Sequence, residues 1–142
     1  MTEPETDSCT ISVENWQMQC CGTPFSVGDK VEWLVYKHDR VSVVTGRAIE
    51  YYYEKHSSDW RELLMLTGTV DEIKALFVSI ELHPNPAENH NCTHHCVYRN
   101  HKVIEYADGW DKDSEELELG EYEVRLIDCT VRPAKKSEVT FS

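Results

Sequence analysis

Cysteine and histidine, the residues best suited to metal or thiol chemistry, concentrate in two short segments of this sequence. One is the adjacent pair Cys20-Cys21, and the other is the segment 90–96, which reads His-Asn-Cys-Thr-His-His-Cys. Thiolate and imidazole are ligand types that zinc takes readily. If the protein binds an ion, we therefore predict zinc. The candidate ligands are Cys20, Cys21, Cys92, His94, His95 and Cys96.

The spacing of these residues suggests how a zinc site would be built. Cys92 and Cys96 would be its core ligands, because a loop or one helical turn can bring residues four positions apart together. One of the adjacent cysteines and one of the two histidines would complete a set of four. The alternative is a histidine-rich surface loop beside ordinary buried thiols.

The same cysteines allow a second kind of chemistry. A thiol beside Gly22 can become reactive when a histidine lies near it. A cysteine nucleophile would also need a base within hydrogen-bond distance and a group that stabilises an oxyanion. The sequence contains no Gly-x-Ser-x-Gly motif, no phosphate-binding glycine loop and no dinucleotide-binding motif. We therefore expect a non-catalytic binding or interaction module. The alternative is a thiol- or metal-dependent enzyme that uses Cys20/Cys21 or the Cys92–Cys96 cluster.

Cys9 and Cys129 stand apart from these segments. Neither has a histidine near it in the sequence, so each is expected to be a small apolar residue of the core.

The charge of the chain favours some partners over others. Acidic residues outnumber basic ones 26 to 14, and the net charge is −12. Such a surface repels phosphate backbones, because nucleic-acid affinity comes largely from lysine and arginine. One interpretation of this charge is solubility alone. If the charge is functional, we expect a basic protein as partner and no nucleic acid. A nucleic-acid-binding barrel is the further alternative, suggested by the many aromatic residues. Tyr52 and Trp110 are the predicted binding-surface residues.

The N-terminal segment bears on the compartment. Residues 1–7 are acidic and polar, unlike a secretory signal, and no stretch approaches the ~20 apolar residues of a membrane helix. We therefore expect a cytoplasmic protein with reduced thiols that does not bind membranes.

Short strands are expected to position the candidate site residues. Apolar, β-branched and aromatic residues recur in short runs, several with the alternation of a half-buried strand. We expect a flexible lead-in over 1–8, a single β-rich domain over 9–134 and a polar tail over 135–142. The fold predicted is a small single-domain β-barrel or barrel-like sandwich with at most short helical turns. The predicted strands include 30–36, 41–45, 49–53, 63–70, 75–82, 97–106 and 121–131.

The segments between these strands contain turn residues and charges. Residues 83–89 include two prolines and are predicted to be a loop. A second, acidic loop is predicted over 108–120. Asp111 and Asp113 match two ligand positions of a calcium-binding loop, but Glu116 stands where that motif requires glycine, so no calcium site is predicted there.

One part of the sequence resembles a known family. The run Trp-Gln-Met-Gln-Cys-Cys-Gly-Thr-Pro-Phe at 16–25, followed by Val27-Gly28-Asp29, Val31 and Trp33, resembles the opening of an uncharacterised bacterial domain family. That resemblance implies no established activity. Gly-Asp-x-Val at 28–31 and Gly-x-Val-x-x-Ile at 68–73 are similar to turns of SH3-like and oligonucleotide-binding barrels, whose tight corners need glycine.

Overall fold

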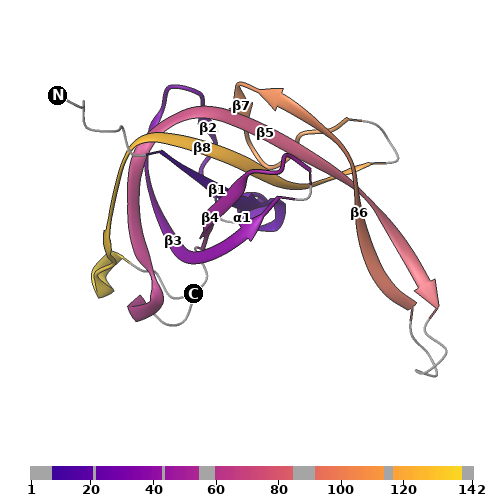
Figure 1. Ribbon diagram of the computed structural model, residues 1–142, viewed down its shortest axis with the longest axis horizontal. Helices are drawn as coiled ribbons and strands as arrows, with labels where there is room; N and C mark the ends of the chain where they lie inside the picture. Colours follow the sequence, from indigo (N-terminus) through magenta and orange to yellow (C-terminus); the bar gives the residue numbers. More distant parts are fainter. Residues whose placement is uncertain are drawn as a thin grey trace.

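Five strands of the protein pair in a closed ring, seen in the ribbon of the computed structural model (Figure 1). The structure describes residues 8–20, 22–42, 44–54, 60–84, 92–113 and 117–138; for Cys20, Trp60, 80–84 and 92–96 it describes the backbone alone. In ring order the strands are β3 (Lys30–Val41), β4 (Ala48–Tyr53), β1 (Cys9–Glu14), β8 (Glu118–Pro133) and β5 (Leu64–Pro84), which pairs back with β3. The predicted mainly β fold is confirmed.

All but one of the pairings in the ring are antiparallel. The exception is β1 with β4, which run parallel with Ile11 opposite Tyr51. Strand β6 (Cys92–Ile104) pairs with the second half of β5, and the two form an arm that projects from the ring at the lower right of Figure 1. The remaining elements are α1 (Asn15–Cys20), β2 (Phe25–Ser26), η1 (Trp60–Glu62), β7 (Tyr106–Ala107) and η2 (Lys136–Glu138).

The core fills the inside of the ring. Alternate residues of β1, β3 and β8 point inward, as the period of two predicts, and are almost completely buried. Three aromatic rings pack edge to face at one end of this core, with centroids 4.9 Å apart for Phe25–Trp33 and 5.6 Å apart for Trp33–Tyr53. Helix α1, which the sequence did not predict, also contributes: Met18 is buried, and Gln17 Nε2 donates a hydrogen bond to the Tyr53 carbonyl over 2.8 Å.

Two strand predictions need correction. The predicted strand at 41–45 is wrong, because after Val41 the chain turns: Ser42 Oγ accepts hydrogen bonds from the backbone N–H of Val44 and of Thr45, each over 3.2 Å. The predicted strands 63–70 and 75–82 are parts of the single strand β5. Its register shifts at three places against β8, and such bulges let one long strand bend around a ring.

The predicted loop at 83–89 begins later than expected. His83 and Pro84 still belong to β5, opposite Thr93 and Cys92. A proline is tolerated there because it is the last residue of the strand; residues 85–91 lie outside the described part of the chain. The acidic loop predicted over 108–120 ends before residue 118, because β8 begins at Glu118.

The backbone at 92–96 also differs from expectation. It is extended strand rather than a loop or helical turn, because it pairs with the end of β5. At roughly 3.3 Å per residue, the Cα atoms of Cys92 and Cys96 are about 13 Å apart.

The helices are short. Within the described residues, none is long and apolar enough to span a membrane.

Candidate functional site

Two adjoining cavities, which we call together the acidic groove, lie beside β1 and β8: the smaller is lined by residues of both strands, and the larger lies between α1, the 109–113 loop and the start of β8. Their volumes are about 310 and 630 Å³, and both are lined by Asn15, Glu118 and Leu119. The smaller cavity is lined further by Ser12, Glu14, Arg40, Tyr52, Val78, Tyr98, Gly120 and Glu121. The larger is lined further by Gln19, Gly109, Trp110, Asp111, Lys112, Asp113 and Leu117.

Strand β8 places two carboxylates on its outer face. Glu121 and Glu123 alternate with Tyr122 and Val124, which are fully buried inside the ring. The glutamates are themselves only 5% and 3% exposed, because the end of the β3–β4 hairpin lies over them. Arg40 and Thr45 from that hairpin contact Glu121 and Glu123 respectively. Strand β8 is therefore covered on both faces here, once by the apolar core and once by polar side chains.

Glu121 is the centre of a polar cluster. Arg40 Nη2 lies 3.1 Å from its Oε2 and 3.2 Å from its Oε1, the Tyr98 hydroxyl donates to Oε1 over 2.5 Å, and Ser12 Oγ donates to Oε2. Burial lowers the pKa of Arg40, but the Glu121 carboxylate, through its charge and its hydrogen bond, together with Tyr52 and Tyr98, raises that pKa above its ordinary value. By distance, the two side chains form a salt bridge.

Tyr52 forms the aromatic wall of the smaller cavity. The Arg40 guanidinium lies 5.2 Å from the centre of its ring, and the rings of Tyr36 and His38 lie 5.3 and 5.0 Å away. Burial raises the pKa of Tyr52, and although Arg40 opposes this, the net shift is upward. Its hydroxyl thus remains protonated, as a donor, at neutral pH.

Two buried polar atoms at this site have no hydrogen-bond partner among the described residues: Arg40 Nε and Glu123 Oε1. The other oxygen of Glu123 accepts from Thr45 Oγ1 over 2.8 Å. Leaving a buried polar atom unpaired costs about 1–3 kcal/mol. The cluster therefore holds one donor and one acceptor with unused hydrogen-bonding capacity.

Trp110 stands at the larger cavity on an anchored loop. Its side chain is 64% exposed. The backbone beside it is held by Gln19 Nε2, which donates to the Gly109 carbonyl over 2.8 Å, and by Asp108 Oδ1, which accepts from the Trp110 N–H over 2.8 Å. Gly109 has a φ of 90°, and a Cβ there would lie 2.9 Å from Met18 Cβ, so glycine is required. The loop thus presents an indole ring to solvent at a defined place.

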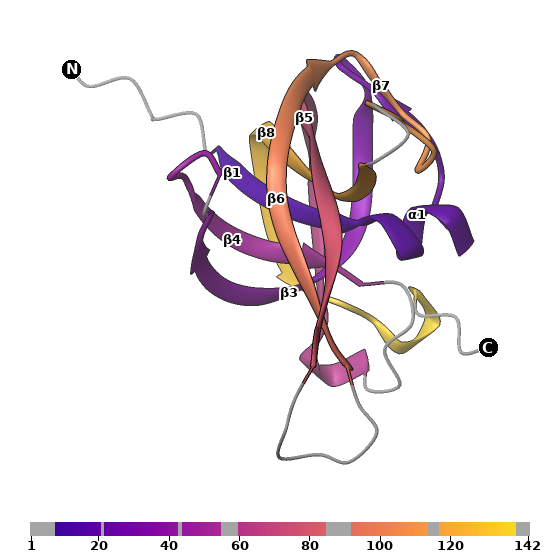
Figure 2. The ribbon, with the colours of Figure 1, turned by 90° about the vertical axis from the view of Figure 1, so that its right-hand side faces the viewer.

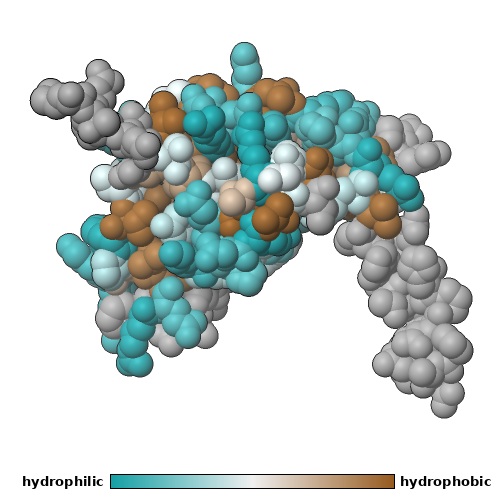
Figure 3. Space-filling view, viewed as in Figure 1, coloured by the Kyte–Doolittle hydropathy of each residue, from teal (hydrophilic) through white to brown (hydrophobic). Residues whose placement is uncertain are grey.

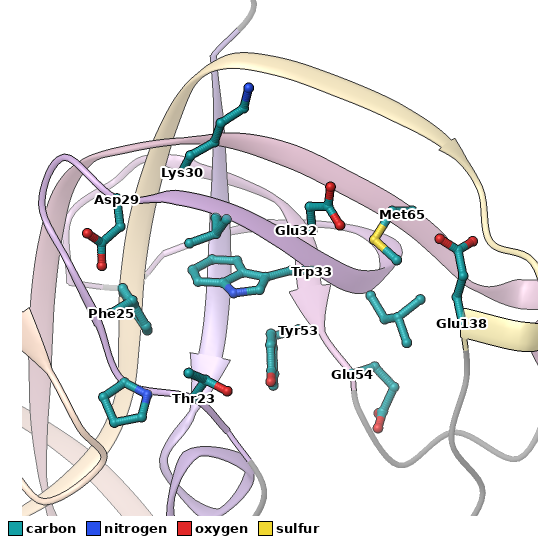
Figure 4. A pocket seen from close by; sticks show the side chains of 13 residues that line it. Thr23, Phe25, Asp29, Lys30, Glu32, Trp33, Tyr53, Glu54, Met65 and Glu138 are labelled. Atoms are coloured by element: carbon teal, nitrogen blue, oxygen red, sulfur yellow. The ribbon is translucent and has the colours of Figure 1, made fainter.

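A further groove of about 520 Å³ lies at the aromatic end of the core (Figure 4). Its floor is made by Phe25, Trp33 and Tyr53, each less than a tenth exposed. Glu32, Glu54 and Glu138 lie at its edges in Figure 4, and Glu138 is paired with Arg132. Because these aromatic side chains are core residues, we regard the acidic groove as the better candidate site.

The space-filling view shows how polar and apolar residues are distributed on one face of the protein. Figure 3 shows polar side chains over much of the visible face, with apolar ones in separate patches rather than one broad area. This face therefore shows no broad apolar patch among the described residues.

The structure carries the predicted metal ligands on two separate elements. Cys20 is in α1, whereas Cys92, His94, His95 and Cys96 are in the arm strand β6, and Figures 1 and 2 show α1 and the far end of β6 apart. Cys21 and the side chains of the other five lie outside what the structure describes. Among the side chains that it does describe, no group of three or more His, Cys, Asp or Glu is arranged to hold a metal. The zinc site stays a prediction.

The two predicted binding-surface residues lie in the acidic groove, one in each cavity: Tyr52 in the smaller and Trp110 in the larger. Sequence analysis missed Arg40, Tyr98 and Glu121. A signal for Glu121 was present, because a strand that alternates glutamate with Tyr122 and Val124 must place its carboxylates on one face.

Comparison with known proteins gives a family but no activity. No curated protein and no solved structure matches the chain. A family model described as a family of unknown function, DUF6578, matches residues 7–128. The resemblance to an uncharacterised domain family is thereby confirmed, and the chain belongs to DUF6578.

Proposed function

We propose that this protein is a non-catalytic binding module whose acidic groove takes a basic segment of a partner protein. The observation that carries the proposal is the meeting of Tyr52 and Trp110 with an excess of carboxylates along one groove. The lining holds Glu14, Asp111, Asp113, Glu118 and Glu121 against Arg40 and Lys112.

The chemistry of these groups favours a cationic ligand. Among the carboxylates, Glu14 accepts a hydrogen bond from a neutral donor, Trp16 Nε1, over 2.6 Å. Asp113 accepts one from Asn100 over 2.8 Å and is also paired with Lys102 Nζ over 2.6 Å. Lysine and arginine side chains can pair with such carboxylates and can stack on an exposed indole such as Trp110. A phosphate backbone would meet net repulsion.

We further infer that the closed ring is a small β-barrel. The order of neighbouring strands around the ring, with β1–β4 as its single parallel pair, is that of an oligonucleotide-binding barrel. The order along the chain differs, because this chain begins with the strand that is third in such a barrel. In that alignment β5 and β8 stand for the first two strands, β1 for the third, and β3 and β4 for the last two.

This barrel topology supports the location of the binding site. Oligonucleotide-binding barrels take ligands on the face of their second and third strands and between two loops, those after the first and fourth strands. In this protein the second and third strands correspond to β8 and β1. The two loops correspond to the β5–β8 connection, which carries Trp110, and to the β3–β4 connection beside Arg40. The acidic groove coincides with that face, so we propose that a common type of binding surface carries reversed charge in this protein.

The experiment is a fluorescence or calorimetric titration of the whole chain with a lysine- and arginine-rich peptide at low and physiological salt. We expect binding that weakens as salt is added, because surface charge is screened over about 10 Å at 0.1 M. Trp110→Ala should weaken it by about fivefold or more, and Glu14→Gln with Glu118→Gln by about threefold or more.

Matched variants outside the groove serve as controls. Tyr106→Ala removes another exposed aromatic ring, 52% exposed, and Glu105→Gln removes another exposed carboxylate. Both should leave the affinity unchanged. Equal losses in these controls would mean that only overall charge matters, and binding of a single-stranded oligonucleotide at physiological salt would replace the proposal with the nucleic-acid alternative.

A further inference from the structure

Two cysteines that the sequence separates by 120 positions meet in the structure. The Sγ atoms of Cys9, at the start of β1, and Cys129, near the end of β8, are 3.2 Å apart. Both residues are thiols and are buried, at 6% and 7% exposure. Their burial agrees with the expected core role, but their contact was not predicted.

A β-bulge in β8 makes this contact possible. Cys9 lies opposite Leu126, which faces the core. Regular alternation would turn Cys129 to the opposite face from Leu126. Between Thr67 and Thr69 of β5, however, the register with β8 shifts, and Asp128 adopts a left-handed backbone with a φ of 54°. The extra residue returns Cys129 to the face of Leu126, beside Cys9.

Gly68, the β5 residue at the bulge, leaves room for the sulfur. A Cβ at this position would lie 3.3 Å from Cys129 Sγ and 3.1 Å from Leu126 Cβ. A glycine on one strand and a left-handed residue on the other thus act together to bring the second thiol to the first.

The pair can be reached from outside. A cavity of about 480 Å³ is lined by both cysteines together with Ser8, Glu50, Tyr51 and Thr130. Because each cysteine exposes only a small part of its surface, a small reagent can reach the sulfurs more easily than a bulky one.

We propose that Cys9 and Cys129 form a dithiol that a small hydroperoxide oxidises to a disulfide. One thiol takes the distal oxygen of the peroxide to give a sulfenic acid, and the corresponding alcohol, or water from hydrogen peroxide, leaves. The second sulfur attacks the first, the S–S bond forms and water leaves. Two electrons pass from the thiols to the peroxide, and a dithiol reductant reverses the change.

The geometry favours this intramolecular step. The sulfurs must approach by only about 1.2 Å to reach a disulfide bond length of about 2.05 Å. The bond would join β1 to β8, strands that are already hydrogen-bonded neighbours, and so would close a loop that spans most of the chain. This modification is separate from the proposed binding function, because neither cysteine lines the acidic groove.

The test uses the full chain with Cys20→Ser, Cys21→Ser, Cys92→Ser and Cys96→Ser, so that only the pair remains. After treatment with hydrogen peroxide we expect an intact monomer lighter by two hydrogens, with no thiol left for alkylation in denaturant. The melting temperature should rise by about 5–10 °C, and dithiothreitol should restore the original mass and melting temperature.

The matched control adds Cys129→Ser, which should gain oxygen instead of losing hydrogen and show no rise in melting temperature. Peptide mapping of the peroxide-treated wild-type chain, searched for a 9–129 cross-link, gives a second readout that does not depend on how the multiple variant folds. Thiols that remain alkylatable, oxygen adducts alone or disulfide-linked dimers would overturn the proposal.

Discussion

The hydroxyl of Tyr122, inside the ring, donates a hydrogen bond to Asp111 and accepts one of 2.9 Å from the backbone N–H of Gly109. Burial and the neighbouring Asp111 raise the pKa of Tyr122 far above its ordinary value, so the hydroxyl stays a donor at every physiological pH. A core residue of β8 thereby holds the loop that presents Trp110 to the acidic groove.

Replacing Tyr122 by phenylalanine should uncouple this loop from the core. The change leaves Asp111 and the Gly109 N–H without their partner, so we expect a loss of about 1–3 kcal/mol in the free energy of unfolding. Hydrogen exchange of the loop amides should also quicken. Denaturant unfolding and exchange mass spectrometry measure the two effects. Tyr106→Phe, on an exposed tyrosine, should change neither; equal effects in both variants would contradict the assignment.

Removing Arg40 should destabilise the protein through Glu121. In Arg40→Met the carboxylate, whose side chain is 7% exposed, loses its cation. We expect a loss of about 1–2 kcal/mol, below the range for fully buried pairs because the Arg40 side chain is 38% exposed. Urea unfolding of Arg40→Met, Glu121→Gln and the double variant measures the coupling. If the double variant loses the sum of the two single losses in free energy of unfolding, the interaction between Arg40 and Glu121 adds no stability.

Asp128 should be a position where glycine stabilises the fold. Its φ of 54° lies in the left-handed region, which costs most residues about 1–2 kcal/mol and costs glycine almost nothing. We expect Asp128→Gly to raise the free energy of unfolding by about 0.5–1 kcal/mol and Asp128→Val to lower it by about 1–2 kcal/mol. Thr130→Gly, in the same strand, should instead be destabilising. Thermal and urea unfolding check the order of the three variants.

The pH dependence of stability should have a contribution from Glu138. Hydrogen bonds from Arg132 and from the Lys135 backbone, at 2.8 and 2.7 Å for Oε1, lower the pKa of Glu138 from 4.5 to about 2. A carboxyl group with a lowered folded-state pKa stabilises the fold above its unfolded-state pKa, and that contribution is lost as pH falls from about 4.5 towards 2.

A carbon-13 NMR titration of the glutamate carboxyls measures this pKa directly. The Glu138 midpoint should lie near pH 2 and move towards 4.5 in Arg132→Met. In Glu138→Gln, unfolding should become less sensitive to acid over the same range. A wild-type midpoint close to 4.5 would show that the hydrogen bonds do not persist in solution.

The local pattern of residues determined much of the strand content. The β-branched and aromatic run from Lys30 predicted β3, and the turn at Gly28 is present with its φ of 94°. The acidic character of the surface, too, follows from composition alone, since charged side chains rarely become buried. Tyr52 and Trp110 were predicted from the sequence as binding-surface residues, and each lines one cavity of the acidic groove.

Tertiary structure decided which of these residues meet. Joining two predicted strands into β5, pairing β1 with β4 and placing Arg40 over Glu121 all depend on contacts between distant segments, which periodicity does not encode. The meeting of Cys9 and Cys129 depends on one further detail, the bulge at Asp128. Because side chains alternate along a strand, a single extra residue changes the face on which every later side chain lies, so strand register decides which side chains come together here.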